Sequence, residues 1–209
     1  MIGRRGLLGG AGAMALAGAA PPRPRVLAFG DSLFAGYGLP RGAGMVPQLQ
    51  AWLDRNGPPV TILPAAISGD TTYGGRARIG FSLRRNRPDA VIVELGGNDM
   101  LLGWTAARAE ANLDAILARA GQGGRPLLLV GLNPIPGDAD WRQAWRAVWP
   151  RLADRHGAVL LPSLYAPIAA LPKAEHRDYL LADGVHPNAA GIRLMVAALG
   201  PKVGQMLDQ

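Results

Sequence analysis

Five short apolar runs, each followed by a longer stretch of mixed character, restrict the fold of this chain more than any other feature. The clearest run is Ala90–Leu95, in which every residue except Glu94 is apolar. Such a run is typical of a parallel strand that is covered by helices on both faces. The other four runs are Val26–Phe29, Val60–Leu63, Pro126–Leu132 and Ala158–Leu161. We therefore expect five strands that lie in one buried sheet.

The stretches between these runs have the spacing of apolar residues that predicts helices. They are Val46–Arg55, Thr71–Arg85, Ala106–Ala120, Trp141–His156 and Asn188–Leu199, and Pro201 is expected to interrupt the last of them. Strands that alternate with helices predict an α/β fold of three layers, with a five-stranded parallel sheet between two layers of helices. No repeat or internal linker divides the chain, so we expect one domain after its first residues.

The first residues do not fit this alternation and predict an export signal. Arg4 and Arg5 precede an apolar run of Gly, Ala, Leu and Met that reaches Ala20, and a proline-rich segment follows. The run is shorter than the roughly 20 residues that a membrane-spanning helix needs. We expect residues 1–25 to be a signal peptide with a short linker, of the twin-arginine type, and residues 26–209 to be a periplasmic domain. If the leader does not function, the chain stays in the cytoplasm.

Charge and composition exclude several classes of function. Removal of the leader would take away two arginines and lower the formal net charge from +7 to +5. No DNA- or RNA-binding motif is present, and the arginines crowded between residues 76 and 87 are expected to form a solvated helix face, so we expect no nucleic-acid partner. The chain has no cysteine, which excludes disulfides, thiolate metal sites and a cysteine nucleophile. We expect no metal, no other cofactor, no membrane span in the mature chain, and a monomer.

Polar, glycine-flanked segments follow the first three expected strands. They are Gly30-Asp31-Ser32, Ser68-Gly69-Asp70 and Gly96-Gly97-Asn98-Asp99. Because the carboxyl ends of parallel strands meet at one edge of the sheet, we expect the three segments to lie together there. None of them contains a phosphate-binding loop of the P-loop or dinucleotide type.

A fourth segment, Asp183-Gly184-Val185-His186-Pro187, carries a carboxylate three residues before a histidine. That spacing lets Asp183 orient the imidazole of His186 and stabilise its charged form. A serine hydroxyl becomes a nucleophile only beside such a base, and Ser32 is the one serine that directly follows a strand. No serine lies in a G-x-S-x-G elbow, which argues against the α/β-hydrolase fold. Candidate donors to an oxyanion are the Asn98 side chain and the backbone N–H groups of Gly69 and Ser32.

These four segments resemble the four blocks of the SGNH (GDSL) hydrolases, in the same order along the chain. More narrowly, Phe29–Tyr37, Ile67–Thr71 and Val93–Asp99 look like the thioesterase I/lysophospholipase L1 group, whose members are often called arylesterases. The resemblance runs from about Val26 to the C-terminus and implies a flavodoxin-like fold. The chain departs from that group just before the second block, where Pro64 stands near the position of a polar Asn.

The resemblance implies a role for each matching residue. Ser32 would be the nucleophile, His186 the base and then the acid, and Asp183 its orienting carboxylate. The oxyanion hole would consist of Ser32 N–H, Gly69 N–H and Asn98 Nδ2. The sequence does not show what supports the Gly69 loop once the polar Asn is replaced.

The resulting hypothesis is a serine hydrolase that cleaves small carboxylic esters and thioesters through an acyl-enzyme on Ser32. Four apolar side chains are candidates for the acyl-binding wall: Leu101, Leu102, Trp104 and Ile135. Two alternatives stay open at this point. The same blocks serve carbohydrate O-acetyl esterases, and a pseudo-hydrolase that binds lipid or cell-wall ligands without turnover is a further, non-enzyme possibility.

Overall fold

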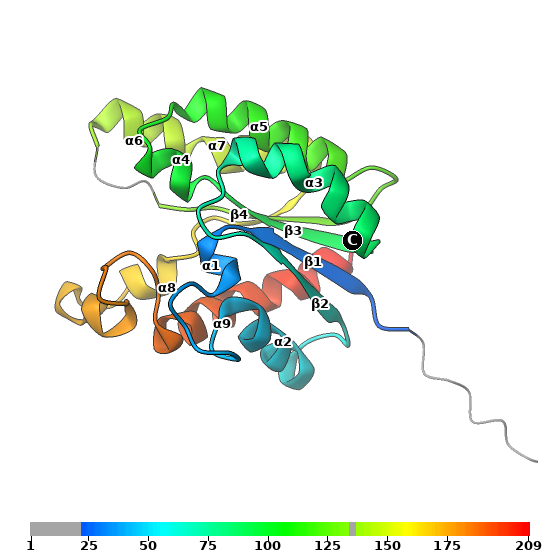
Figure 1. The fold of residues 1–209 in the computed structure, drawn as a ribbon, viewed down its shortest axis with the longest axis horizontal. Helices are drawn as coiled ribbons and strands as arrows, with labels where there is room; N and C mark the ends of the chain where they lie inside the picture. The colour runs from blue at the N-terminus through cyan, green and yellow to red at the C-terminus, as the bar shows by residue number, and fades with distance from the viewer. Residues whose placement is uncertain (1–21, 134–136) are drawn as a thin grey trace, which may run out of the picture.

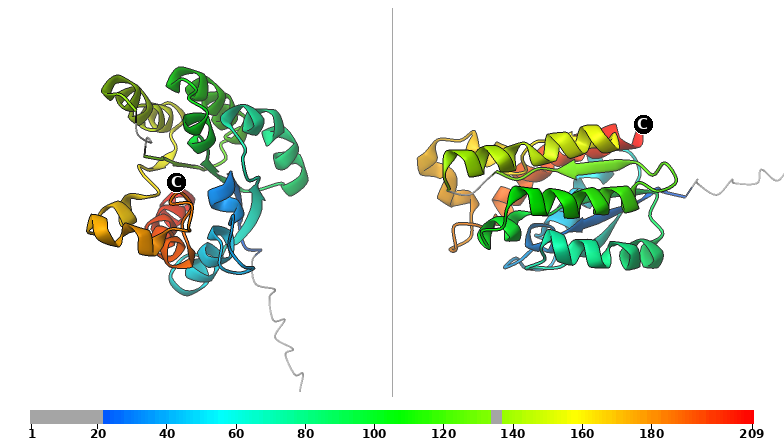
Figure 2. Two further views of the ribbon diagram at one scale, coloured as in Figure 1. Left: turned by 60° about the vertical axis from the view of Figure 1, so that its left-hand side comes forward. Right: turned by 90° about the horizontal axis from the view of Figure 1, so that it is seen from above.

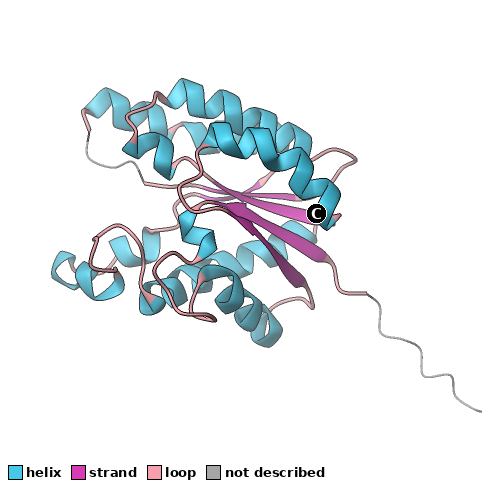
Figure 3. Cartoon of the chain, viewed as in Figure 1, coloured by secondary structure: helices cyan, strands magenta, loops and turns pink. Residues whose placement is uncertain are grey.

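The structure is a computed structural model, and it describes residues 22–133 and 137–209. Its centre is one parallel sheet with the strand order β2-β1-β3-β4-β5. The strands are β1 (Arg25–Gly30), β2 (Thr61–Ala66), β3 (Ala90–Glu94), β4 (Leu127–Val130) and β5 (Val159–Leu161). All five expected strands are therefore present, and the expected parallel sheet is confirmed (Figure 3).

Helices cover both faces of the sheet and make three layers (Figures 1 and 2). One face carries α3 (Thr72–Asn86), α4 (Gly97–Leu101), α5 (Ala106–Ala120), α6 (Ala139–Arg146) and α7 (Val148–His156). The other carries α1 (Ser32–Ala35), α2 (Met45–Asn56), α8 (Ala166–Ala169) and α9 (Ala189–Leu207), with the 3₁₀ helix η1 (Lys173–Tyr179) beside α9. The short elements α1, α4, α8 and η1 were not expected from the sequence.

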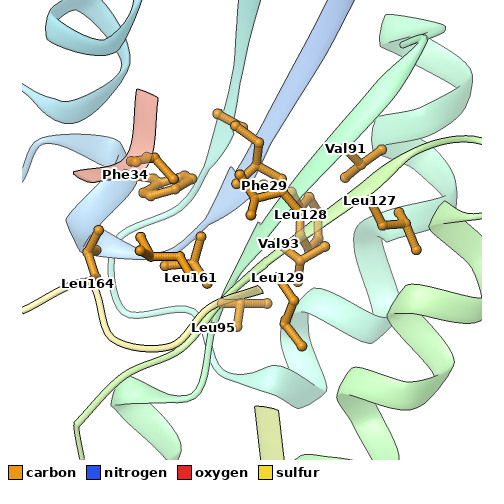
Figure 4. Close-up of a cluster of buried hydrophobic side chains, with 14 of the residues drawn as sticks. Phe29, Phe34, Val91, Val93, Leu95, Leu127, Leu128, Leu129, Leu161 and Leu164 are labelled. Atoms are coloured by element: carbon orange, nitrogen blue, oxygen red, sulfur yellow. The ribbon is translucent and has the colours of Figure 1, made fainter. Parts of the chain in front are cut away.

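The core lies on both faces of the central strands. All five residues of β3 are buried, as the continuous apolar run predicts for a strand between two helical layers. Figure 4 shows Phe29, Val91 and Val93 among the leucines of β4 and β5. Removing this apolar surface from water is the main favourable contribution to the stability of the domain.

The prediction of one helix over Trp141–His156 is wrong, because the chain breaks at Ala147 into α6 and α7. The cause is Pro150, whose ring would clash with the carbonyl group of Arg146 in a continuous helix and which has no N–H to donate. Because a proline disrupts the helical turn before it, Pro150 was a signal in the sequence for two helices instead of one.

The predicted interruption at Pro201 is also wrong, because α9 continues through the proline to Leu207. Val203 and Met206, which follow Pro201, are fully buried. The burial of these apolar side chains offsets the free-energy cost of the hydrogen bond that the proline cannot make. Asn188 begins α9 as its N-cap, and its side chain accepts from the N–H groups of Ala190 and Gly191.

The order of the strands places the switch point between β1 and β3, because the chain moves to one side after β1 and to the other after β2. Ligands bind at such a point, beyond the carboxyl ends of the strands. The proposed leader lies almost entirely outside the described residues. Among the described helices, none is long and apolar enough to cross a membrane.

Candidate active site

Ser32 lies at the carboxyl end of β1, where the strand turns directly into α1. Asp31 is the N-cap of this short helix, and its Oδ1 accepts from the N–H of Leu33 at 3.1 Å. As the first helical residue, Ser32 has a backbone N–H with no acceptor in a preceding turn. The side-chain hydroxyl and the backbone N–H of Ser32 are therefore both held at the switch point.

Ser32, His186 and Asp183 form a row of hydrogen bonds. The Oγ of Ser32 is 2.9 Å from Nε2 of His186, and Nδ1 of His186 is 2.7 Å from Oδ2 of Asp183. The row joins the end of β1 to the loop before α9, which are 154 residues apart in the sequence. The structure thus brings the three residues together in the order that nucleophilic catalysis by a serine requires.

The turn from Asp183 to His186 fixes the carboxylate as well as the ring. Oδ1 of Asp183 accepts from the backbone N–H groups of Val185 and His186, at 2.9 and 3.0 Å. These bonds, the one to the Val185 N–H above all, lower the pKa of Asp183 from 3.8 to about 2. Asp183 is therefore ionised throughout the pH range in which an imidazole titrates.

Two tyrosines that the sequence reasoning did not single out adjoin this row. The ring centroid of Tyr37 is 4.5 Å from that of His186, in a tilted arrangement. The hydroxyl of Tyr165 donates to the carbonyl oxygen of Val185 at 2.7 Å, and burial raises the pKa of this tyrosine. Tyr37 is only five residues after Ser32, so the sequence could have indicated that it lies near the site. Nothing in the sequence around Tyr165 indicates that it lies near His186.

Gly69 and Asn98 lie at the same edge. Gly69 has a φ of +81°, is exposed, and leaves open space where a Cβ would stand; no hydrogen bond within the described ranges uses its N–H. Nδ2 of Asn98 donates to the carbonyl oxygen of Asp70 at 2.9 Å and to Oδ2 of Asp31 at 3.1 Å. Both hydrogens of this amide have partners, so a third acceptor must share or replace one of them.

A pair of buried acids lies behind the serine. Glu94 is fully buried at the end of β3, and its Oε2 accepts from the N–H of Asp31 at 3.3 Å. Its Oε1 has no hydrogen-bond partner among the described residues. Burial, and then the neighbouring charge of Asp31, raise the pKa of Glu94 well above its usual value. Burial also raises the pKa of Asp31, to about 6.

Asp99 fixes the Asn98 segment to α3. It is fully buried, and its carboxylate accepts from both the backbone N–H and the hydroxyl of Thr72. The side chain of Asn112 on α5 donates to the same hydroxyl at 3.2 Å. A buried carboxylate needs such partners, because an unpaired charge in the interior is costly.

A cavity of about 410 Å³ opens beside Ser32 and His186. Apolar parts of its lining come from Leu33, Met100, Leu101, Leu132 and Val185. Of the four predicted acyl-binding residues, only Leu101 lines this cavity in the described ranges.

The other three predicted acyl-binding residues lie elsewhere. Leu102 is 60% exposed, the ring of Trp104 packs under the Arg108 guanidinium at 3.7 Å, and Ile135 lies outside the described residues. Within the part of the chain that the structure describes, no three His, Asp or Glu side chains are grouped to hold a metal ion.

A single parallel sheet between two layers of helices, with a serine beside a histidine at its switch point, defines an α/β protein with the site of a hydrolase, and the missing elbow motif separates it from the α/β-hydrolase fold. Residues 28–194 match the GDSL-like lipase/acylhydrolase family. The chain belongs to this family, and it is a carboxylic ester hydrolase. The family and the fold that the resemblance implied are thereby confirmed.

Named relatives share about a third of their residues with this chain over most of its length. Esterase TesA of Pseudomonas aeruginosa is 31% identical over 183 residues, which are 87% of this chain and 89% of the relative. Thioesterase 1/protease 1/lysophospholipase L1 of Escherichia coli is 33% identical over 165 residues, which are 78% of this chain and 75% of the relative. The crystal structure of the SGNH-hydrolase family esterase AlinE4 has a TM-score of 0.73 at 37% identity, covering 90% of this chain and 99% of that one.

Proposed function

We propose that this protein cleaves carboxylic esters and thioesters by transferring the acyl group first to Ser32 and then to water. The observation that carries the proposal is the row of hydrogen bonds from Ser32 through His186 to Asp183, with distances of 2.9 and 2.7 Å. The names of the relatives, which include an esterase, an arylesterase and a thioesterase, support the same reaction class.

In the first half of the reaction, Nε2 of His186 accepts the proton of the Ser32 hydroxyl as Oγ attacks the acyl carbon. The imidazolium then gives this proton to the departing alcohol or thiol, and an acyl-enzyme on Ser32 remains. In the second half His186 takes a proton from water, the hydroxide attacks the acyl carbon, and the proton returns to Ser32. Asp183, with its pKa of about 2, stays ionised and stabilises the imidazolium in both halves.

The negative charge that develops on the acyl oxygen needs donors that are fixed before the reaction. We assign this role to the N–H groups of Ser32 and Gly69 and to Nδ2 of Asn98. The Gly69 N–H is open to a ligand. Asn98 would contribute by weakening its longer bond, at 3.1 Å, to Asp31 Oδ2 while it keeps the bond to the Asp70 carbonyl. Catalytic hydrogen bonds often tighten in this way only when the substrate is bound.

The cavity indicates the kind of acyl group. Met100, Leu101 and Leu132 give one part of its lining an apolar character. Aliphatic and aryl acyl or alcohol groups would bury their surface there, at roughly 25 cal/mol per Å². This favours esters with medium or long apolar groups over sugar acetates.

The proposal is tested by comparing the purified protein with Ser32→Ala on p-nitrophenyl esters from acetate to palmitate and on a palmitoyl thioester. We expect the alanine variant to lose hydrolysis by roughly 10⁴-fold or more. Equal rates for the two proteins would refute the mechanism. Activity limited to acetyl esters, without thioester cleavage, would favour an O-acetyl esterase.

We also propose that residues 1–25 direct export. The support is the basic start, the apolar run that ends at Ala20 and the prolines after it. Expression of the full chain, followed by fractionation and determination of the N-terminus, tests this. A chain that keeps Met1 and remains in the cytoplasm would refute it, and loss of export in an Arg4→Lys, Arg5→Lys variant would indicate the twin-arginine route.

A further inference from the structure

Arg78, on α3, contacts three separate segments of the candidate site with the three nitrogens of its guanidinium. Nε donates to Oδ2 of Asp70 at 2.6 Å, Nη1 to the carbonyl oxygen of Ala65 at 2.7 Å, and Nη2 to the carbonyl oxygen of Gly30 at 2.9 Å. The side chain is only 16% exposed, and its Cζ lies 3.9 Å from the ring centroid of Phe29. The guanidinium is therefore fixed in position by its hydrogen bonds and by stacking.

Two of these contacts join the ends of adjacent strands. Gly30 is the last residue of β1, and the next two residues are Asp31 and Ser32. Ala65 lies near the end of β2, from which the chain continues to Gly69. Nη1 and Nη2 of one planar group thus hold the backbone just before the Ser32 N–H and the backbone that leads to the Gly69 N–H.

The third contact fixes the residue after Gly69 and, through it, Asn98. Asp70 is paired with Arg78 through its carboxylate, while its backbone oxygen accepts from Nδ2 of Asn98 at 2.9 Å. Gly74 in α3 leaves the space that this carboxylate fills, because a Cβ at that position would lie 2.0 Å from Oδ1 of Asp70. Each proposed oxyanion donor is therefore close to an atom that Arg78 holds. Ser32 follows Gly30 by two residues, Gly69 precedes Asp70 by one, and Asn98 is hydrogen-bonded to Asp70.

We propose that Arg78 is a positioning residue that sets the relative placement of the three oxyanion donors; this rests on the function proposed above. A rigid donor with three N–H directions meets acceptors on three segments at once, which a lysine ammonium on a flexible stem cannot do. Arg78 also supplies the support for the Gly69 loop that the sequence left unassigned, since it holds Ala65 in the strand that leads to this loop.

The test uses Arg78→Lys, which keeps the charge, and Arg85→Lys as the matched control. Arg85 lies on the same helix, is exposed, and makes no side-chain hydrogen bond within the described ranges. Removal of one oxyanion donor typically lowers kcat by about 10²–10³-fold, and displacement of the donors should cost a part of that. We expect Arg78→Lys to lower kcat on a p-nitrophenyl ester by roughly 10–100-fold, with KM changed little, and Arg85→Lys to match the unchanged protein.

A fluorophosphonate that labels Ser32 separates positioning from folding, because its phosphoryl oxygen occupies the same oxyanion hole. If Arg78 positions the donors, all Arg78→Lys molecules become labelled, at a rate reduced about as much as kcat. If Arg78 only stabilises the fold, a smaller fraction becomes labelled at the normal rate, and the proposal is overturned. Partial recovery of kcat in Arg78→Ala on addition of methylguanidinium would be further support.

Should Arg78→Lys fail to fold, Asp70→Asn serves as the second variant, because it keeps the shape of the partner and weakens only the charged bond to Nε. We expect kcat to fall by about 10-fold with complete labelling, as for a partial loss of donor placement. Unchanged kcat in Asp70→Asn would overturn the proposal. If the unchanged protein and Ser32→Ala hydrolyse esters equally, the proposed function itself has failed, which is a different outcome from an active protein that tolerates Arg78→Lys.

Discussion

The buried carboxyl of Asp31 should make the stability of this protein fall as the pH rises from about 4 to about 6. Asp31 is only 2% exposed, and burial is the largest cause that raises its pKa from 3.8 to about 6. Between these two values the unfolded chain has released the proton while the folded chain still holds it. The folded state binds more protons in this window, so raising the pH lowers the free energy of unfolding.

The size of the effect follows from the shift. A difference of about two pKa units corresponds to roughly 3 kcal/mol, because each unit is worth about 1.4 kcal/mol. The contribution is complete below the unfolded value of 3.8 and is lost above about 6. The pKa of Glu94 is shifted in the same direction, so this neighbour does not reverse the sign.

The perturbation that isolates this effect is Asp31→Asn, which removes the titrating group and keeps an oxygen that can cap α1. The free energy of unfolding is measured by urea denaturation at about pH 4 and about pH 8 for the unchanged protein and the variant. Any fixed cost of the amide facing Asn98 is present at both pH values and cancels. We expect Asp31→Asn to gain roughly 3 kcal/mol relative to the unchanged protein between the two pH values.

Asp154→Asn is the control, because Asp154 is an exposed residue of α7 whose side chain makes no hydrogen bond within the described ranges. Its stability should follow the same pH curve as the unchanged protein. Parallel curves for Asp31→Asn and the unchanged protein would refute the reasoning, since burial of Asp31 would then carry no energetic cost.

Three further outcomes are expected. Asp183→Asn should lower kcat by about 10⁴-fold in a p-nitrophenyl ester assay, because His186 loses the carboxylate that fixes its tautomer; a loss of less than tenfold would contradict that role. Asn98→Ala should lower kcat by about 10²–10³-fold with little change in KM in the same assay, and a change in KM alone would count against an oxyanion donor. Gly200→Ala should destabilise the fold by about 1 kcal/mol in urea denaturation, because a Cβ there would lie 2.2 Å from the ring of Trp52. This steric cost exceeds the gain in helix propensity. Higher stability of the variant would show that the ring moves freely.

The sheet was predictable because its signal is local and strong. Apolar runs such as Ala90–Leu95 have no alternative to burial on both faces, and three of the five expected helices, Val46–Arg55, Thr71–Arg85 and Ala106–Ala120, end within about one residue of the observed bounds. The errors concern prolines, whose effect depends on tertiary context. Pro150 divides a helix at the clash with the residue four places earlier, whereas Pro201 is tolerated because buried residues follow it.

The candidate site was predictable where a sequence block carries the chemistry, and hidden where support comes from elsewhere in the chain. Ser32, Asn98 and His186 each lie in a short pattern at a strand end or before a helix. Arg78 is one of five arginines between residues 76 and 87, which the sequence could only treat as a solvated face. Only its hydrogen bonds to the ends of β1 and β2 distinguish it from the others.

The charges around Asn98 explain why costly buried groups occur beside the serine. The amide of Asn98 is held from one side by Oδ2 of Asp31 and from the other by the backbone oxygen of Asp70, whose own carboxylate is fixed by Arg78. An apolar residue at position 31 would avoid the cost of burying the Asp31 carboxylate, roughly 3 kcal/mol. It would, however, leave one hydrogen of the Asn98 amide without an acceptor, and the amide would be held less firmly in its orientation. If the three donors act as proposed, the stability given up at neutral pH maintains the geometry in which they can meet one oxygen.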